Sequence, residues 1–143
     1  MALLSARMFS PVTIINAVAA IENTTGRTSE AIELASLGRD SFILELDITP
    51  NETTDALLWE LRPLTFGAGT YSTIPLRRME GGTAAGPTII PLTGSIANVG
   101  TDGEVHQYQF SGVHADSLQL WVASSETNST YTITAKYRTI KYG

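Results

Sequence analysis

The sequence predicts an all-β fold, an antiparallel β-sandwich of jelly-roll type with an extended N-terminal arm. From residue 27 onward, apolar and polar residues alternate in short runs that Gly, Pro, Asn and Asp separate, as in antiparallel strands. Ser and Thr supply 31 of the 143 residues and charged residues only 16%, a composition that suits strand surfaces. Residues 1–21 are largely apolar and carry a single charge, Arg7. We therefore divide the chain into an arm, 1–27, and a sandwich domain, 28–143.

Seven runs of the sandwich domain are predicted as strands. They span 42–48, 56–64, 71–77, 88–92, 104–110, 117–123 and 130–142. The run at 71–77 is expected at a sheet edge because Pro75 cannot donate to a ladder. The Gly-rich residues 81–87 are predicted as a flexible loop. Residues 29–37 fit either one or two helical turns or an opening strand, and we favour the strand.

The alternation also predicts which side chains form the core. On the faces that carry Leu, Trp and Ile, six side chains are expected to be buried: Leu44, Leu46, Trp59, Leu118, Leu120 and Ile133. If residues 29–37 form a strand, Ile32 and Leu34 point inward with them.

The arm contains seven large apolar side chains with no clear period. They are Leu3, Leu4, Met8, Phe9, Val12, Ile14 and Ile15. A segment of this kind has to dock, either on its own domain or on a neighbouring protein. We expect it to anchor the protein to a partner; in the alternative, it is a core element and its removal unfolds the domain. A secretory signal is not favoured, because Pro11 interrupts the apolar stretch.

Composition narrows the classes of partner. The net charge of -5, with the basic residues dispersed, argues against nucleic acid. No apolar run reaches the length of about 20 residues that a membrane helix requires. Residues 22–60 hold nine acidic and two basic residues, whereas Arg77 and Arg78 and the segment 136–141 are basic. Attraction between such regions of different protomers predicts self-association.

The sequence offers little chemistry for catalysis, so we expect no enzyme and no cofactor. It has no cysteine, and its two histidines, His106 and His114, lack the spacing of a metal site. His114 close to Asp116 fits a base with an orienting carboxylate, but we favour the interpretation that His106 lies on a strand face with Tyr108 and that His114 belongs to a polar corner. No G-x-S-x-G motif is present, and the glycine-rich loop lacks the Gly-Lys-[Ser/Thr] ending of a phosphate-binding loop.

Two further sets of residues are candidates for binding or catalytic groups. The carboxylates Asp47, Asp55, Glu60 and Asp116 are candidates for glycoside chemistry, although strand parity brings no two of them together. An aromatic platform for sugar is conceivable from Trp59, Trp121, Tyr71 and Tyr108, although tryptophans opposite Leu-rich positions are more typical of a core.

Four segments resemble small virion proteins of tailed bacteriophages that have a β-sandwich fold. They are TSEAIEL (28–34), FILELDITP (42–50), ALLWELRPL (56–64) and the long closing segment 110–137, which looks like the final hairpin of such proteins. The resemblance implies a structural role in the virion, assembled in the host cytoplasm. The partner would be the major capsid protein or another virion protein, and resemblance to cement proteins also implies a homo-oligomer, with a trimer expected.

Two classes of function follow. The first is a non-enzymatic capsid decoration (cement) protein that binds the head shell through its arm, with Arg77 and Arg78 as further contacts, or else a neck or tail component. The second is a carbohydrate-binding β-sandwich module. An open aromatic pair such as Trp59 and Tyr71 would favour the second class.

Overall fold

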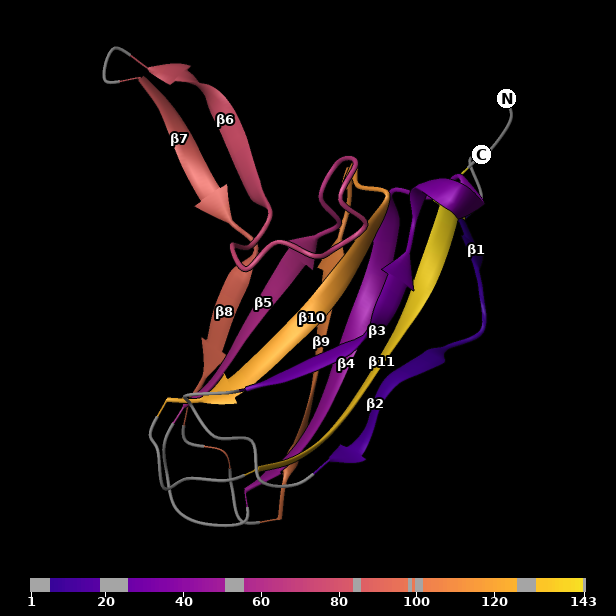
Figure 1. Ribbon diagram of the computed structural model, residues 1–143. Helices are drawn as coiled ribbons and strands as arrows, with labels where there is room; N and C mark the ends of the chain where they lie inside the picture. Colours follow the sequence, from indigo (N-terminus) through magenta and orange to yellow (C-terminus); the bar gives the residue numbers. More distant parts are fainter. Residues whose placement is uncertain are drawn as a thin grey trace.

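The computed structural model describes residues 6–18, 26–50, 56–83, 86–97, 99, 102–125 and 131–142. These residues fold as two facing antiparallel sheets from which a two-stranded hairpin projects (Figure 1). The all-β class predicted from the alternation is confirmed. The described residues include no α-helix, and the only helical turn among them is the 3-10 turn η1 (Ala35–Leu37).

The first sheet is built around the long last strand. It contains β1 (Ala6–Met8), β2 (Val12–Val18), β11 (Tyr131–Tyr142), β4 (Ser41–Pro50) and β9 (Glu104–Phe110). β1 and β2 follow each other along one edge of β11, and β4 pairs with the other edge. β9 pairs with β4 on the outside.

The second sheet faces the first. Its order is β3 (Arg27–Glu33), β10 (Ser117–Ser124), β5 (Leu57–Pro63) and β8 (Thr93–Ile96). The third pairing joins β6 (Arg77–Thr83) to β7 (Gly86–Pro91). In Figure 1 this hairpin points away from the body of the sandwich, beyond the end of β5 and β8.

The core lies between the two large sheets, and the predicted faces are confirmed. All six side chains expected in the core are buried, and so are Ile32 and Leu34. Residues 29–33 belong to β3, so the favoured strand assignment is correct, while 35–37 form the short 3-10 turn. Most of these side chains lie in strands whose opposite face is largely polar, which is why the period of two located them, while Leu34 lies just beyond the end of β3.

Two sequence-based assignments are wrong. Residues 71–76 form no strand: Tyr71 makes one isolated bridge to Leu64, and the chain continues as a loop to Arg77. Residues 81–83 and 86–87 are not loop but lie in the paired strands of the hairpin. Hairpin pairing supplies the backbone hydrogen bonds that glycine-rich composition alone does not predict.

Most of the predicted arm that the structure describes belongs to the sandwich. β2 pairs with β11, and Ile14 and Ile15 are each only 4% exposed. These two side chains therefore pack in the protein's own core and are not available to a partner. Leu3 and Leu4 lie outside the described residues.

Candidate functional site

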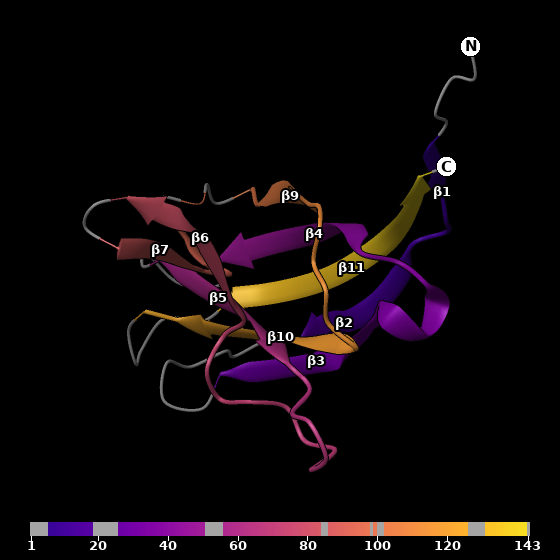
Figure 2. The same ribbon diagram turned by 90° about the horizontal axis from the view of Figure 1, so that it is seen from above.

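One end of the sandwich gathers most of the large exposed apolar side chains. This end, which we call the hairpin end, carries β6 and β7, the loops at 64–76 and 111–116, and the 3-10 turn (Figures 1 and 2). Of nine large exposed hydrophobic residues among those described, six belong to it: Leu37, Phe66, Ile74, Met79, Ile89 and Ile90. Apolar side chains concentrated in this way are typical of a surface that contacts another molecule.

The hairpin exposes apolar residues on both of its faces. Met79 pairs with Ile89 on one face, and Ile90 pairs with Arg78 on the other. Met79 is 66% and Ile89 53% exposed. A two-stranded hairpin has little stability of its own in water, because neither face is covered. The predicted partner residues Arg77 and Arg78 begin this hairpin, at the point where it leaves the sandwich.

Phe66 is the most exposed large apolar residue among those described, at 94%. It lies at the tip of a tight loop that the Leu64–Tyr71 bridge closes. Within the loop, both the backbone nitrogen and the hydroxyl of Thr65 donate to the carbonyl oxygen of Thr70, at 2.8 and 2.7 Å. The Phe66 ring is therefore held out into solvent by an ordered backbone.

A cleft of about 300 Å³ lies at the base of the hairpin. Its apolar wall consists of Leu76, Leu92, Phe110 and Val113. The lining also includes Arg77, Arg78 and His114. The cleft therefore combines its apolar wall with basic groups. The described residues place no acidic side chain in this lining.

The apolar wall of the cleft is continuous with the core. Val113 is buried, and Leu76, Leu92 and Phe110 pack against the core cluster. The Phe110 ring stacks on Phe42 with 4.9 Å between centroids. The cleft is therefore a preformed feature of the sandwich and not a gap between mobile surface side chains.

The remaining predicted contact residues of the N-terminal segment divide into two groups. Met8 and Val12 are exposed and remain available for contact. Phe9 is only partly exposed, because its ring lies under the guanidinium of Arg39.

The tryptophans and tyrosines considered as candidates for a sugar platform do not form an open one. Trp59 is buried in the core, where its ring lies 5.1 Å from that of Tyr108. The Tyr71 hydroxyl shares a 2.8 Å hydrogen bond with Ser117. An open pair of Trp59 and Tyr71 is therefore not formed.

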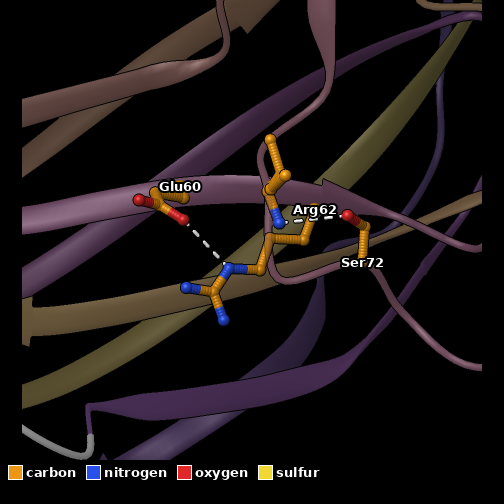
Figure 3. A network of polar contacts seen from close by, with 4 residues as sticks. Glu60, Arg62 and Ser72 are labelled. Atoms are coloured by element: carbon orange, nitrogen blue, oxygen red, sulfur yellow. Dashed lines mark hydrogen bonds and ion pairs between the residues drawn. The ribbon is translucent and has the colours of Figure 1, made fainter.

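Trp121 lies on the outer face of the second sheet, but its ring is covered. The guanidinium carbon of Arg62 lies 4.6 Å from the ring centroid. Arg62 is held there by an ion pair with Glu60, with 2.9 Å between Nε and Oε2 (Figure 3). A ligand ring would have to displace this guanidinium to stack on Trp121.

The described catalytic candidates form no compact cluster, and among them only His114 and Asp116 border a common hollow. His106 pairs with Glu104 at 2.9 Å on β9. Asp47 is on β4 and Glu60 on β5, in different sheets, and Asp55 lies outside the described residues. His114 and Asp116 are both exposed at the hairpin end. Within the described ranges, no three His, Cys, Asp or Glu side chains are grouped as metal ligands would be.

Sequence reasoning missed the residues that dominate the hairpin end. Ile89 and Ile90 were assigned to the predicted strand 88–92 without a role, and Phe66 and Met79 were assigned to no element. The usable signal was an aromatic residue followed by Gly67 and Gly69, both of which have positive φ. Such a sequence favours a tight loop that presents its side chain to solvent.

Among the described residues there is no apolar helix of membrane-spanning length. Comparison of the chain with protein-family models, with curated proteins and with solved structures gave no match in any of the three.

Proposed function

We propose that the chain is a non-enzymatic structural protein of a tailed-bacteriophage virion, a capsid decoration protein that attaches to the head shell. The observation that carries the assembly role is the exposed hairpin, whose Met79, Ile89 and Ile90 have no covering layer among the described residues. The virion context rests on the resemblance of the strand segments to small phage virion proteins.

The hairpin is suited to contact another protein by the physical character of its surface. It combines exposed apolar side chains with arginines at its base, and interfaces are enriched in both kinds of residue. Burying a side chain of this size contributes about 1.5–3 kcal/mol, from which the cost of association is subtracted. We therefore expect the hairpin to anchor the protein to its partner, whereas the sequence analysis expected the N-terminal arm to do so.

Carbohydrate binding is the weaker proposal for this chain. Sugar-binding faces offer aromatic rings in the open, whereas Trp59 is buried and Trp121 is covered by Arg62. The hairpin end has no tryptophan in the lining of its cleft. These arrangements support a protein partner.

The test of the proposal is the protein composition of particles. Virions are collected from cells in which the phage genome that encodes this chain is expressed, and they are purified on a density gradient. Mass spectrometry then quantifies the proteins in the purified virions. We expect the chain in a fixed ratio to the shell protein. A chain that is found only in the soluble fraction contradicts the proposal.

A matched pair of variants then tests the hairpin. Met79→Ser combined with Ile89→Ser changes two exposed residues on one hairpin face, and Val105→Ser changes an exposed residue on β9. We expect the hairpin variant to leave the particle and the β9 variant to remain bound. Wild-type occupancy of the hairpin variant would rule out the hairpin as the contact.

A further inference from the structure

We propose that this protein associates with itself by inserting Phe66 of one copy into the cleft at the base of the β6–β7 hairpin of a second copy. The Phe66 loop is the projecting element of this contact, and the cleft receives it. The inference deepens the assembly role proposed above, and it is tested on the purified chain alone. Its failure is therefore distinguishable from a failure to bind particles.

The Phe66 loop has the properties of an anchor. Phe66 is 94% exposed, so none of the residues that the structure describes covers its ring. Its backbone is held by the Thr65–Thr70 hydrogen bonds, and Ser72 N donates to Pro63 O at 2.9 Å just below them. Because this backbone is ordered before contact, docking of the ring requires little further loss of chain entropy.

The cleft has the properties of a receptor for an aromatic ring. Phe110 contributes an aromatic surface that is fixed from behind, by stacking on Phe42 and by an edge contact with Trp59 at 6.1 Å. Leu76 and Leu92 supply aliphatic walls beside it. An aromatic ring that enters such a cleft packs against Phe110 as well as excluding water.

The charges around the two elements are complementary. Asp40 and Asp116 border the same hollow as Phe66, whereas Arg77 and Arg78 line the cleft. Arg39 also borders the Phe66 hollow, but its guanidinium lies over Phe9 and donates to the carbonyl oxygen of Leu37. When Phe66 enters the cleft of another copy, the aspartates approach the arginines. This complementarity identifies a second copy as the occupant.

The placement of both elements favours a closed oligomer. Val113 and His114 line the cleft and also the Phe66 hollow, so the two sites adjoin on one end of the molecule. In Figure 2 the connection from β9 to β10, which contains both residues, crosses that end. A contact between two different surfaces builds a filament unless the rotation between copies closes, and elements that adjoin on one end are compatible with a small closed assembly.

The first experiment measures mass by sedimentation over a range of protein concentrations. We expect wild-type protein to form a closed oligomer of two or three copies, with the trimer that the resemblance implies as one such form. Phe66→Ala should remain monomeric at concentrations at which the wild type is fully associated. Val105→Ala removes a similarly exposed apolar side chain elsewhere, on β9, and should associate like the wild type.

The second experiment exchanges charges. Arg77→Glu and Asp116→Lys change exposed side chains, and each alone places like charges across the contact. Each single variant should self-associate at least tenfold more weakly than wild type. The double variant restores opposite charges and should recover association. Thermal unfolding followed by circular dichroism checks that every variant folds.

Three outcomes overturn the proposal. They are a wild-type protein that stays monomeric at all concentrations, a folded Phe66→Ala variant with the mass of the wild type, and a double charge variant that associates no better than the single variants. If the wild type is monomeric and the Phe66→Ala variant no longer binds particles, Phe66 contacts a different protein and not a second copy of this chain.

Discussion

The guanidinium of Arg39 lies over the ring of Phe9, with 3.7 Å between Cζ and the ring centroid. This contact ties the N-terminal segment to the connection between the 3-10 turn and β4. The backbone nitrogen of Phe9 also donates to the carbonyl oxygen of Thr139 on β11, at 3.1 Å. The segment between β1 and β2 is therefore held at a specific place on its own domain.

Replacing Phe9 with Ala should weaken this attachment. The change removes a cation–π contact, which contributes about 0.5–2 kcal/mol depending on its exposure. We expect a loss of that size in the free energy of unfolding, measured by urea denaturation. Met8→Ala changes a neighbouring exposed side chain and should alter stability by less than about 0.5 kcal/mol. Equal effects of the two substitutions would contradict a specific role for Phe9.

Removal of residues 1–22 should unfold the domain or destabilise it severely. The truncation deletes β1 and β2, and with them the buried Ile14 and Ile15. Loss of two such side chains costs about 3–6 kcal/mol, a large part of a typical domain stability of 5–15 kcal/mol. Calorimetry measures the result, and a chain that lacks only residues 1–5 is the control. If the truncated chain melts cooperatively at the melting temperature of the full-length chain, residues 6–22 are not needed for folding and fit the role of an anchor.

Replacing Ser29 with Ala should destabilise the protein at an irregular point in the pairing of β3 with β10. The register of β3 and β10 shifts between Gln119 and Trp121, and the Ser29 hydroxyl accepts a 3.0 Å hydrogen bond from Leu120 N there. Without that hydroxyl a buried N–H loses its partner, at a cost of about 1–3 kcal/mol. Urea denaturation measures this loss. Ser36→Ala, which removes an exposed hydroxyl, should be nearly neutral, and an equally neutral Ser29→Ala would refute the argument.

The alternation of the sequence predicted most of the sandwich, because most of its strands bury only one face. β4, β9, β10 and β11 were found in this way, and the side chains expected inward on β4, β10 and β11 are buried. β2 was not found as a strand, because Ile14 and Ile15 are adjacent and yet both buried. Two register shifts in its pairing with β11, and a positive φ of 48° at Ala17, break the period of two on which prediction depends.

The hairpin end was harder to predict, for a different reason. The exposure of Met79 depends on what lies around it in space, which the sequence pattern does not show, and the sequence signal for Phe66 is limited to the glycines that follow it. An apolar residue in a polar loop is compatible both with folding back onto the core and with projecting into solvent. The Leu64–Tyr71 bridge and the pairing of β6 with β7 decide between the two.

Replacing Gly94 with Ala should disturb the core beneath the proposed cleft. Gly94 pairs with Trp59, and a Cβ atom added there would lie 2.6 Å from ring atoms of Trp59. The indole must then shift, and overpacking of this kind costs about 1–3 kcal/mol. Urea denaturation followed by tryptophan fluorescence measures both the stability and the altered surroundings of the ring.

The effect of Gly94→Ala should extend to self-association, because the Trp59 ring supports Phe110 from behind. We expect the folded variant to associate more weakly than wild type in sedimentation. Gly81→Ala is the matched control, since no atom lies within 4 Å of an added Cβ at that position in β6. It should change neither stability nor mass. If the Gly94→Ala variant is destabilised but associates like wild type, the packing around Trp59 does not influence the contact proposed for Phe66.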